Sequence, residues 1–523
     1  MEKIFVYDTT LRDGSQGEDV NFSGEEKMQV ARELDELGVD YIEGGWPGSN
    51  PGDEEFFRLA RKYKFKNSRL VAFGSTRRAK KSVEENKNLA GLLQSGAKAV
   101  ALVGKSWDEQ VKLMNVSLKE NLAMIRESVS FLKKKGLEVI FDAEHFFDGY
   151  KSNPEYALKT LGAAREAGAD FLVLCDTRGG SMFWEVEKII SETIASRSEY
   201  CEVKFGIHAH NDGNLAEANT LAAVRAGACM IQGTINGYGE RCGNADLTSV
   251  IPSLQLKMEY DCLGEKIEEL CRVSGMVSEI ANMTPYKGRP FVGRSAFAHK
   301  GGIHTNLVKK DPTSYEHIAP EEVGNQRRIL ISDLAGVSSV RHKAEEMGID
   351  LTEEQLKEVT SLIKKKESQG FKFEAADASL ALLIKKQIGE IEHPFNLQSF
   401  TVHVHKEEGR HCASQANIKI GSNGETVFKG AEGNGPVDAL NNAFLKALTK
   451  MHHRILKNTH LFNFKVRVVN GGGTQAKVRV LTQFRDGSHI WSTVGVSEDI
   501  IEASWQALWD GMFFKLSGEV NSS

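Results

Sequence analysis

EVKFGIHAHNDGNLAEANTLAAVRAG, residues 202–227, joins a β-rich run to a helical run through a short polar turn. The first run ends in His208 and His210, and the second repeats apolar residues at spacings of three and four. Side chains two positions apart on a strand point the same way, so both imidazoles would face one side. Two such imidazoles make half of a metal site. The plainer interpretation is a polar strand end with two unrelated histidines.

The same strand–helix unit recurs through the first half of the chain. Its helical runs 24–38, 154–168 and 214–227 each end in glycine, a good residue just beyond a helix C-terminus. Eight units over about 250 residues predict an α/β fold, a (β/α)8 TIM barrel, although an open doubly wound sheet uses the same local pattern. No GxGxxG follows the first β-rich run, so nothing favours a dinucleotide-binding sheet. The eight β-rich runs are 3–11, 41–46, 69–75, 99–104, 137–146, 171–177, 202–210 and 229–235.

A TIM barrel carries its chemistry at the C-terminal ends of its strands. Polar residues gather there: Arg12 and Asp13 follow the first run, Glu144 ends the fifth, Thr177 ends the sixth, and Asn244 follows the eighth. The first, seventh and eighth strands lie side by side in a closed barrel, so we expect Asp13 and Asn244 to join the two histidines around one ion. Such a set suits Mn²⁺, Mg²⁺, Co²⁺ or Zn²⁺, and two histidines with one carboxylate also suit Fe²⁺ in an oxygenase.

Length, charge and cysteine content limit the number of domains, the kinds of partner and the cellular compartment that we expect. A chain of 523 residues predicts two to four domains. A net charge of −5 gives no support for nucleic acid or an anionic membrane as a partner. The seven cysteines are scattered, and neither a signal peptide nor a long apolar run is visible, so we expect a cytoplasmic protein with reduced thiols.

The pattern changes beyond about residue 280. We expect a catalytic barrel in residues 1–280 and linker subdomains that cover the active site in residues 281–392. Alternating β-rich runs with two helical runs predict an α+β regulatory domain in residues 393–523.

Three motifs stand out along the barrel: LRDGSQ (11–16) with Lys27, HAHND (208–212) with Ala216 and Ala218, and NGYGERCGN (236–244). They resemble the signature motifs of one enzyme family, the 2-isopropylmalate, homocitrate and citramalate synthases. The likeness covers nearly the whole chain and extends to GGGTQAKVRVLTQF and GVSEDIIEASWQAL in the C-terminal domain. Within the family it is nearest to the citramalate synthases, in YIEGGWPGSNPGDEEFF and FDAEHFFDGYK.

One position departs from the family pattern. Where the second signature has glycine, this chain has Asn214. Asparagine tolerates the left-handed backbone region better than most residues, so we expect the turn to survive.

The resemblance implies an acyltransferase that condenses acetyl-CoA with a 2-oxo acid in a Claisen-type reaction and then hydrolyses the thioester. It favours pyruvate as the substrate, giving (R)-citramalate for isoleucine biosynthesis. One methylene changes binding in an apolar pocket by only about 1–3 kcal/mol, so 2-isopropylmalate synthase and homocitrate synthase stay open as alternatives. We expect Ser75, Val103 and Asp142 to shape the pocket.

The resemblance also implies roles for particular residues. Arg12 would stabilise oxygen charge on the substrate, and Glu144 would orient Arg12 and take part in proton transfer. Thr177 would donate to the substrate carboxylate, or simply cap the turn after its strand. His304 and Tyr315 would act on the acetyl group or the hydrolytic water from the partner subunit, which implies a homodimer.

The C-terminal domain is expected to bind an amino-acid effector, isoleucine. NGGGTQ (470–475) would let an effector approach the backbone, or would form a hairpin turn. More distant alternatives are a metal-dependent aldolase or lyase, an Fe²⁺ oxygenase and an amino-acid sensor with an inactive barrel.

Overall fold

The computed structural model divides into two compact units, residues 1–297 with 318–327 and residues 298–317 with 328–523. The expected domain boundaries at residues 280 and 392 stay predictions. The structure describes residues 1–196, 203–300, 304, 307–308, 310–330, 337–391, 395–408, 411–422, 425–456, 458–469, 476–487 and 489–518. Residues 470–475, the expected effector loop, lie outside this set.

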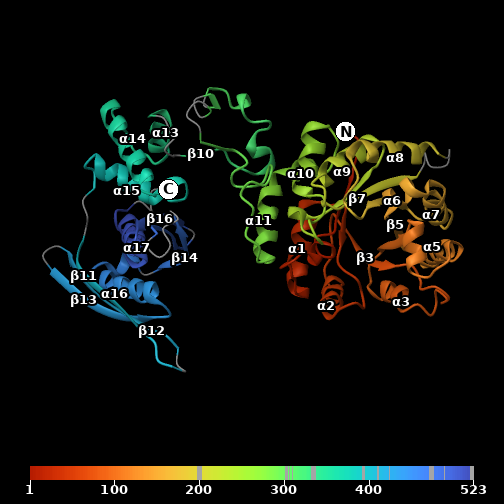
Figure 1. Ribbon diagram of the computed structural model, residues 1–523, viewed down its shortest axis with the longest axis horizontal. Coiled ribbons are helices and arrows are strands. Elements are labelled where there is room, and N and C mark those ends of the chain that lie inside the picture. The colour runs from red at the N-terminus through yellow and green to blue at the C-terminus, as the bar shows by residue number, and fades with distance from the viewer. Residues whose placement is uncertain are drawn as a thin grey trace. The chain divides into compact units, whose positions relative to one another are not determined.

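Eight parallel strands close into a barrel in chain order, which confirms the expected TIM-barrel fold (Figure 1). The barrel closes through β1 and β8, where Tyr7 is in register with Gln232. The strands are β1 (Phe5–Asp8), β2 (Tyr41–Glu43), β3 (Arg69–Ser75), β4 (Ala99–Lys105), β5 (Glu138–Glu144), β6 (Phe171–Asp176), β7 (Lys204–Ala209) and β8 (Met230–Gly233).

Helices surround the barrel, and their ends follow the sequence signals. The helix α1 begins with a capping box between Ser23 and Glu26. Gly38, Gly168 and Gly227 all have positive φ, which confirms their expected place beyond helix ends. The helices are α1 (Gly24–Leu37), α2 (Pro51–Ala60), α3 (Lys87–Gln94), α4 (Asp108–Leu113), α5 (Leu118–Lys134), α6 (Phe146–Ser152), α7 (Pro154–Glu166), α8 (Phe183–Ala195), α9 (Ala216–Arg225), α10 (Leu247–Pro252) and α11 (Leu270–Ile280).

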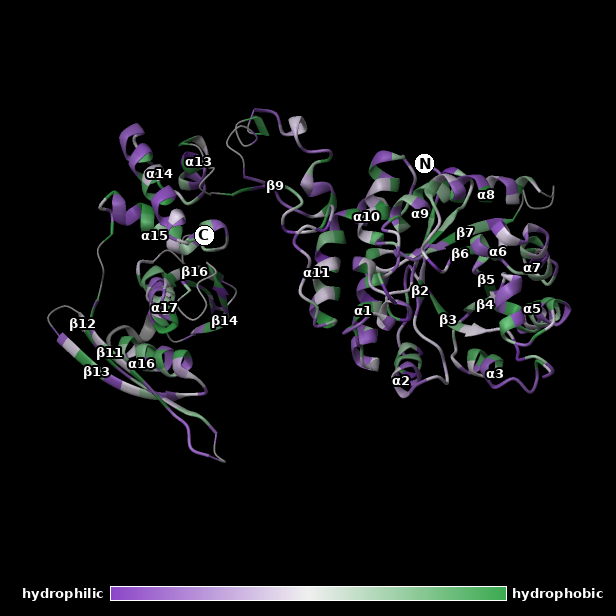
Figure 2. Cartoon of the chain, in the orientation of Figure 1, coloured by the Kyte–Doolittle hydropathy of each residue, from purple (hydrophilic) through white to green (hydrophobic). Residues whose placement is uncertain are grey.

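The strands bury both of their faces. Tyr7, Ile140 and Val173 are fully buried in the cluster inside the barrel, while alternate residues pack outward against the helices. Each large apolar side chain so buried contributes about 1.5–3 kcal/mol. Figure 2 shows hydrophobic residues along the strands and mixed hydrophilic and hydrophobic bands along the surrounding helices. The polar residues that continue the inner face at the C-terminal ends of the strands form the candidate site.

The second unit has a helical part and an α+β part, as expected. A short parallel pair, β9 (Ala298–His299) and β10 (Arg328–Ile329), precedes the helices α13 (Val337–Glu346), α14 (Glu353–Ser368) and α15 (Asp377–Gln387). Two three-stranded antiparallel sheets follow. They consist of β11 (Asn396–His405), β12 (Ala413–Ser422) and β13 (Glu425–Gly433), packed with α16 (Pro436–Leu456), and of β14 (Thr459–Val468), β15 (Val478–Asp486) and β16 (His489–Ser497), packed with α17 (Ile500–Leu516).

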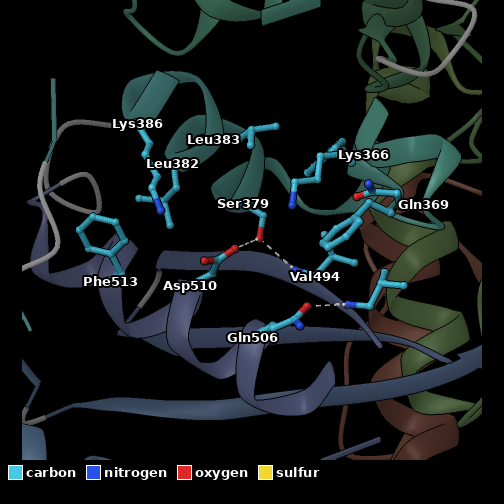
Figure 3. A pocket seen from close by; sticks show the side chains of 13 residues that line it. Lys366, Gln369, Ser379, Leu382, Leu383, Lys386, Val494, Gln506, Asp510 and Phe513 are labelled. Carbon is cyan, nitrogen blue, oxygen red and sulfur yellow. Dashed lines mark hydrogen bonds between the residues drawn. The ribbon is translucent and has the colours of Figure 1, made fainter. Parts of the chain in front are cut away.

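A cavity of about 390 Å³ lies between α14 and α15 on one side and β16 and α17 on the other (Figure 3). Ser379 links the two sides: its hydroxyl accepts from the backbone N–H of Val494 (3.0 Å) and donates to Oδ2 of Asp510 (2.6 Å). Burial raises the pKa of Asp510 to about 6.

Among the described residues, no helix is both long and apolar enough to cross a membrane.

Candidate active site

Asp13, His208 and His210 form a buried group at the barrel mouth, here called the metal cluster. Oδ2 of Asp13 lies 3.1 Å from Nε2 of His208 and 3.7 Å from Nε2 of His210. The two Nε2 atoms are 3.4 Å apart. Ligand atoms at about 2.1 Å from one ion are about 3.0–3.6 Å apart at angles of about 90–120°, close to the three distances of the cluster, so the cluster fits a divalent cation.

The charges within the metal cluster favour deprotonated Asp13. Burial opposes ionisation, but the charge of Arg12 and a hydrogen bond from His208 outweigh it and hold the pKa of Asp13 well below its usual range. For His208, burial lowers the pKa, but the bond to Asp13 outweighs it and raises the pKa. Burial and the neighbouring His208 lower the pKa of His210 to about 4.

Asn244 joins the cluster from the loop after β8, as expected. Its Nδ2 donates to Oδ2 of Asp13 (2.9 Å) and lies 3.1 Å from Nε2 of His208. Its Oδ1 and the Nδ1 of His210 are buried atoms with no hydrogen-bond partner among the described residues. Rotating the amide by half a turn would present Oδ1 to an ion, so the fourth expected ligand also fits a metal site.

Arg12 is held by Glu43, not by Glu144. Its Nε donates to Oε2 of Glu43 (2.7 Å), its Nη1 lies 3.1 Å from Oδ1 of Asp13, and its guanidinium stacks 3.9 Å above the ring centre of Phe73. Burial lowers the pKa of Arg12, but the charges of Asp13 and Glu43 outweigh it and keep the group charged. The expected pairing with Glu144 is wrong because Glu43 ends β2, the strand next to β1.

Glu144 forms an ion pair with Lys105, whose strand β4 is next to β5. The carboxylate is half-buried at the barrel mouth. Glu144 lies at the C-terminal end of β5, where it was expected. Its part in proton transfer stays a prediction.

Thr177 lies at the end of β6 and is half-buried. Its hydroxyl oxygen accepts from the backbone N–H of His145 (2.9 Å). Because that bond uses the oxygen as an acceptor, the hydroxyl hydrogen can still be donated to a substrate carboxylate. His145 has a φ of +58°, in the left-handed region that few residues other than glycine adopt.

His304 and Tyr315 belong to the second unit and contact each other. Their ring centres are 4.4 Å apart, and both side chains are exposed. The pair therefore presents an imidazole and a phenol together at the surface of this unit. Whether the two residues act at a barrel mouth stays a prediction.

Three supporting residues lie inside the barrel, and no sequence motif marks Glu43 or Gln232. Glu43 is fully buried and accepts from the hydroxyl of Tyr7 (2.7 Å) as well as from Arg12. Gln232 contacts His208 on one side and Asp142 on the other. Burial raises the pKa of Asp142 to about 7. Asp142 was expected only to shape the substrate pocket.

The turn after β7 tolerates the departure at position 214. Asn214 has a φ of +56°, in the left-handed region, which confirms that asparagine replaces the usual glycine without losing the turn.

Three protein-family models match successive parts of the chain. The HMGL-like family matches residues 3–277, the homocitrate synthase post-HMGL domain-like family matches residues 291–370, and the LeuA allosteric (dimerisation) domain matches residues 374–515.

Curated relatives match nearly the whole length of the chain. The chain is 47% identical to the (R)-citramalate synthase of Synechocystis sp. over 98% of this chain and 96% of that protein. It is 48% identical to the (R)-citramalate synthase of Aquifex aeolicus over 98% of each chain. The chain belongs to the (R)-citramalate synthase family. The enzyme of the same name from Geobacter sulfurreducens is 47% identical over the full length of both chains, so the family likeness includes the C-terminal domain.

The matched family models agree with the two units of the structure. The metal cluster lies in the HMGL-like part, which is the barrel, and the second unit holds the LeuA allosteric (dimerisation) domain. The resemblance that was visible in the motifs is thereby confirmed.

Proposed function

We propose that this protein is a citramalate synthase that condenses acetyl-CoA with pyruvate and hydrolyses the thioester to (R)-citramalate and CoA. The observation that carries the proposal is the metal cluster with the charged guanidinium of Arg12 beside it, at the mouth of a barrel shared with the (R)-citramalate synthases. The product would feed isoleucine biosynthesis.

Asp13, His208, His210 and Asn244 would hold a divalent ion, Mn²⁺, Mg²⁺, Co²⁺ or Zn²⁺. When bound, the ion supplies Lewis-acid polarisation of the 2-oxo acid carbonyl. The mixed nitrogen and oxygen donors and the two buried atoms without partners, on His210 and Asn244, support this assignment.

Arg12 stabilises negative charge on the keto oxygen as the new carbon–carbon bond forms. Its Nε is held by Glu43 and its Nη1 by Asp13, so the guanidinium plane is fixed before substrate arrives. Its other N–H groups are available to the substrate, because a guanidinium has five donors. Thr177 donates its hydroxyl hydrogen to the substrate carboxylate.

Removal of the methyl proton of acetyl-CoA needs a base close to the barrel mouth. Glu144, with Lys105 beside it, and the pair His304 and Tyr315 are the candidates. We assign His304 and Tyr315 to the partner subunit's active site in a homodimer. The match of residues 374–515 to a dimerisation domain supports the dimer.

The C-terminal domain binds an amino-acid effector, isoleucine, that lowers the activity of the barrel. The match to the LeuA allosteric domain supports regulation, and the end product of the proposed pathway is the natural inhibitor. We place the enzyme in the cytoplasm, where thiols stay reduced, and the cysteines among the described residues are all free.

The test uses the purified full chain with acetyl-CoA, pyruvate and Mn²⁺ under anaerobic conditions. We expect release of the CoA thiol together with (R)-citramalate, identified by chiral chromatography. Absence of thiol release would overturn the proposal, and a requirement for oxygen would favour the oxygenase. Cleavage of a hydroxy acyl-CoA without condensation would favour the lyase.

A further inference from the structure

A line of three buried polar side chains runs inward from the metal cluster. Nδ1 of His208 on β7 lies 2.9 Å from Oε1 of Gln232 on β8. Nε2 of Gln232 donates to Oδ1 of Asp142 on β5 over 3.1 Å. The three residues are 6%, 1% and 4% exposed, so water does not compete for these bonds.

The chemistry of the line fixes the direction of each bond. When Asp142 is ionised its Oδ1 can only accept, so the amide NH₂ of Gln232 faces it and the amide oxygen faces His208. A carbonyl oxygen can only accept, so Nδ1 of His208 carries a hydrogen. The lone pair of neutral His208 is then on Nε2, the atom that lies 3.1 Å from Asp13 in the metal cluster.

The second histidine of the cluster lacks such support. Nδ1 of His210 is buried and has no hydrogen-bond partner among the described residues. The two histidines are therefore not equivalent. One has a protein side chain that sets its tautomer and ring orientation, and the other does not.

We propose that Gln232 and Asp142 are positioning residues of the metal site: Asp142 sets the direction of the Gln232 amide, and the amide holds His208 in the tautomer that binds a metal through Nε2. This inference rests on the proposed metal function of the cluster. It adds a role for two residues that neither contact the ion nor provide a ligand, in the way that outer hydrogen bonds support metal-ligating histidines elsewhere.

The test measures Mn²⁺ affinity of the full chain without substrate, by isothermal titration calorimetry and by the free Mn²⁺ signal in electron paramagnetic resonance. Gln232→Met keeps the length of the side chain but removes both hydrogen bonds. We expect it to weaken Mn²⁺ binding by about 10–100-fold. With Co²⁺ in place of Mn²⁺, we also expect a changed visible absorption spectrum, because the ring of His208 is no longer held.

Asp142→Asn is a second variant of nearly unchanged shape. An asparagine can accept from Gln232 or donate to it, so the Gln232 amide is no longer fixed, and its reversed form would favour the wrong tautomer of His208. We expect Mn²⁺ affinity to fall by about 2–10-fold, because only the fraction of molecules with His208 in the metal-binding tautomer can bind the ion.

The matched control is Gln110→Met. Nε2 of Gln110 lies 2.8 Å from Nε2 of His145, a histidine outside the metal cluster. We expect its Mn²⁺ affinity to equal that of the parent protein.

Two outcomes would overturn the inference in different ways. If the parent binds Mn²⁺ and folded Gln232→Met and Asp142→Asn bind it equally tightly, the positioning role is wrong and the metal site stands. If the parent itself binds no divalent ion, the proposed metal function fails and the positioning role fails with it.

Discussion

Asn244 donates its side-chain amide to Oδ2 of Asp13 over 2.9 Å, although 231 residues separate the two in the chain. The contact exists because β1 and β8 pair to close the barrel. Closure therefore completes the metal cluster, and the cluster is available only in the folded barrel.

Loss of one ligand should remove the metal without unfolding the barrel. His208→Ala is expected to weaken Mn²⁺ binding by at least about 100-fold and to abolish turnover, because the remaining donors cannot replace a neutral imidazole. Calorimetry and circular dichroism measure binding and folding. The control His405→Ala removes an exposed histidine on β11 and should change neither. Unchanged metal stoichiometry in His208→Ala would show that the site lies elsewhere.

Glu43→Gln should slow catalysis while leaving metal binding intact. The neutral amide no longer matches the charge of Arg12, so we expect kcat to fall by about 10–100-fold, with Mn²⁺ affinity within about threefold of the parent.

The matched control for Glu43→Gln is Glu138→Gln. Glu138 also accepts from a tyrosine, Tyr41 (2.9 Å), and pairs with an arginine, Arg69, but it lies at the start of β5, away from the strand ends that carry the site. It should keep the parent kcat. Equal effects of the two substitutions would mean that Glu43 is only structural.

A mixed dimer tests whether His304 and Tyr315 act in the partner's barrel. His208→Ala and Tyr315→Phe should each be inactive or nearly so alone. After subunit exchange of an equal mixture, half of the dimers are hybrids with one intact site, so activity should recover to about one quarter of the parent value. Recovery is measured by thiol release, and none would be seen if the two residues served their own subunit's barrel.

Asp510 should make the C-terminal part less stable as the pH rises. Its pKa is about 6 in the fold against an ordinary value of 3.8, so the folded state binds the proton more tightly. The contribution of Asp510 to the free energy of unfolding is fully present below about pH 4 and is lost as the pH rises through about 6.

Asp510→Asn keeps an acceptor for Ser379 and carries no charge. Relative to the parent, we expect it to gain on the order of 1–3 kcal/mol at pH 8 and almost nothing at pH 4. Thermal unfolding at the two pH values measures the difference. An equal effect of the substitution at both pH values would contradict the assigned pKa.

The barrel and the shared face of its two histidines could be predicted from the sequence because both follow short-range patterns. Short β-rich runs mark the strands, glycine marks several helix ends, and His208 and His210 share a face by strand periodicity alone. Of the residues of β13, only Val427 is buried, so this strand has little apolar alternation from which the sequence could predict it.

The supporting residues could not be predicted because their partners come from other strands. The partner of Arg12 is Glu43 and not Glu144, because β1 pairs with β2. No local sequence pattern encodes that pairing. Gln232 looks like an ordinary strand residue until His208 and Asp142 are placed on either side of it. Sequence periodicity gives the face on which a residue lies, but barrel register decides which side chains meet.

The most direct test of the account is a competition among 2-oxo acids. Equal concentrations of pyruvate, 2-oxobutyrate and 2-oxoisovalerate are incubated with limiting acetyl-CoA, Mn²⁺ and the full chain, and the products are separated by mass spectrometry. Product ratios report the ratios of kcat/KM for the three acids. We expect citramalate to be the main product. A predominance of 2-isopropylmalate, or the absence of any condensation product, would contradict the proposed function.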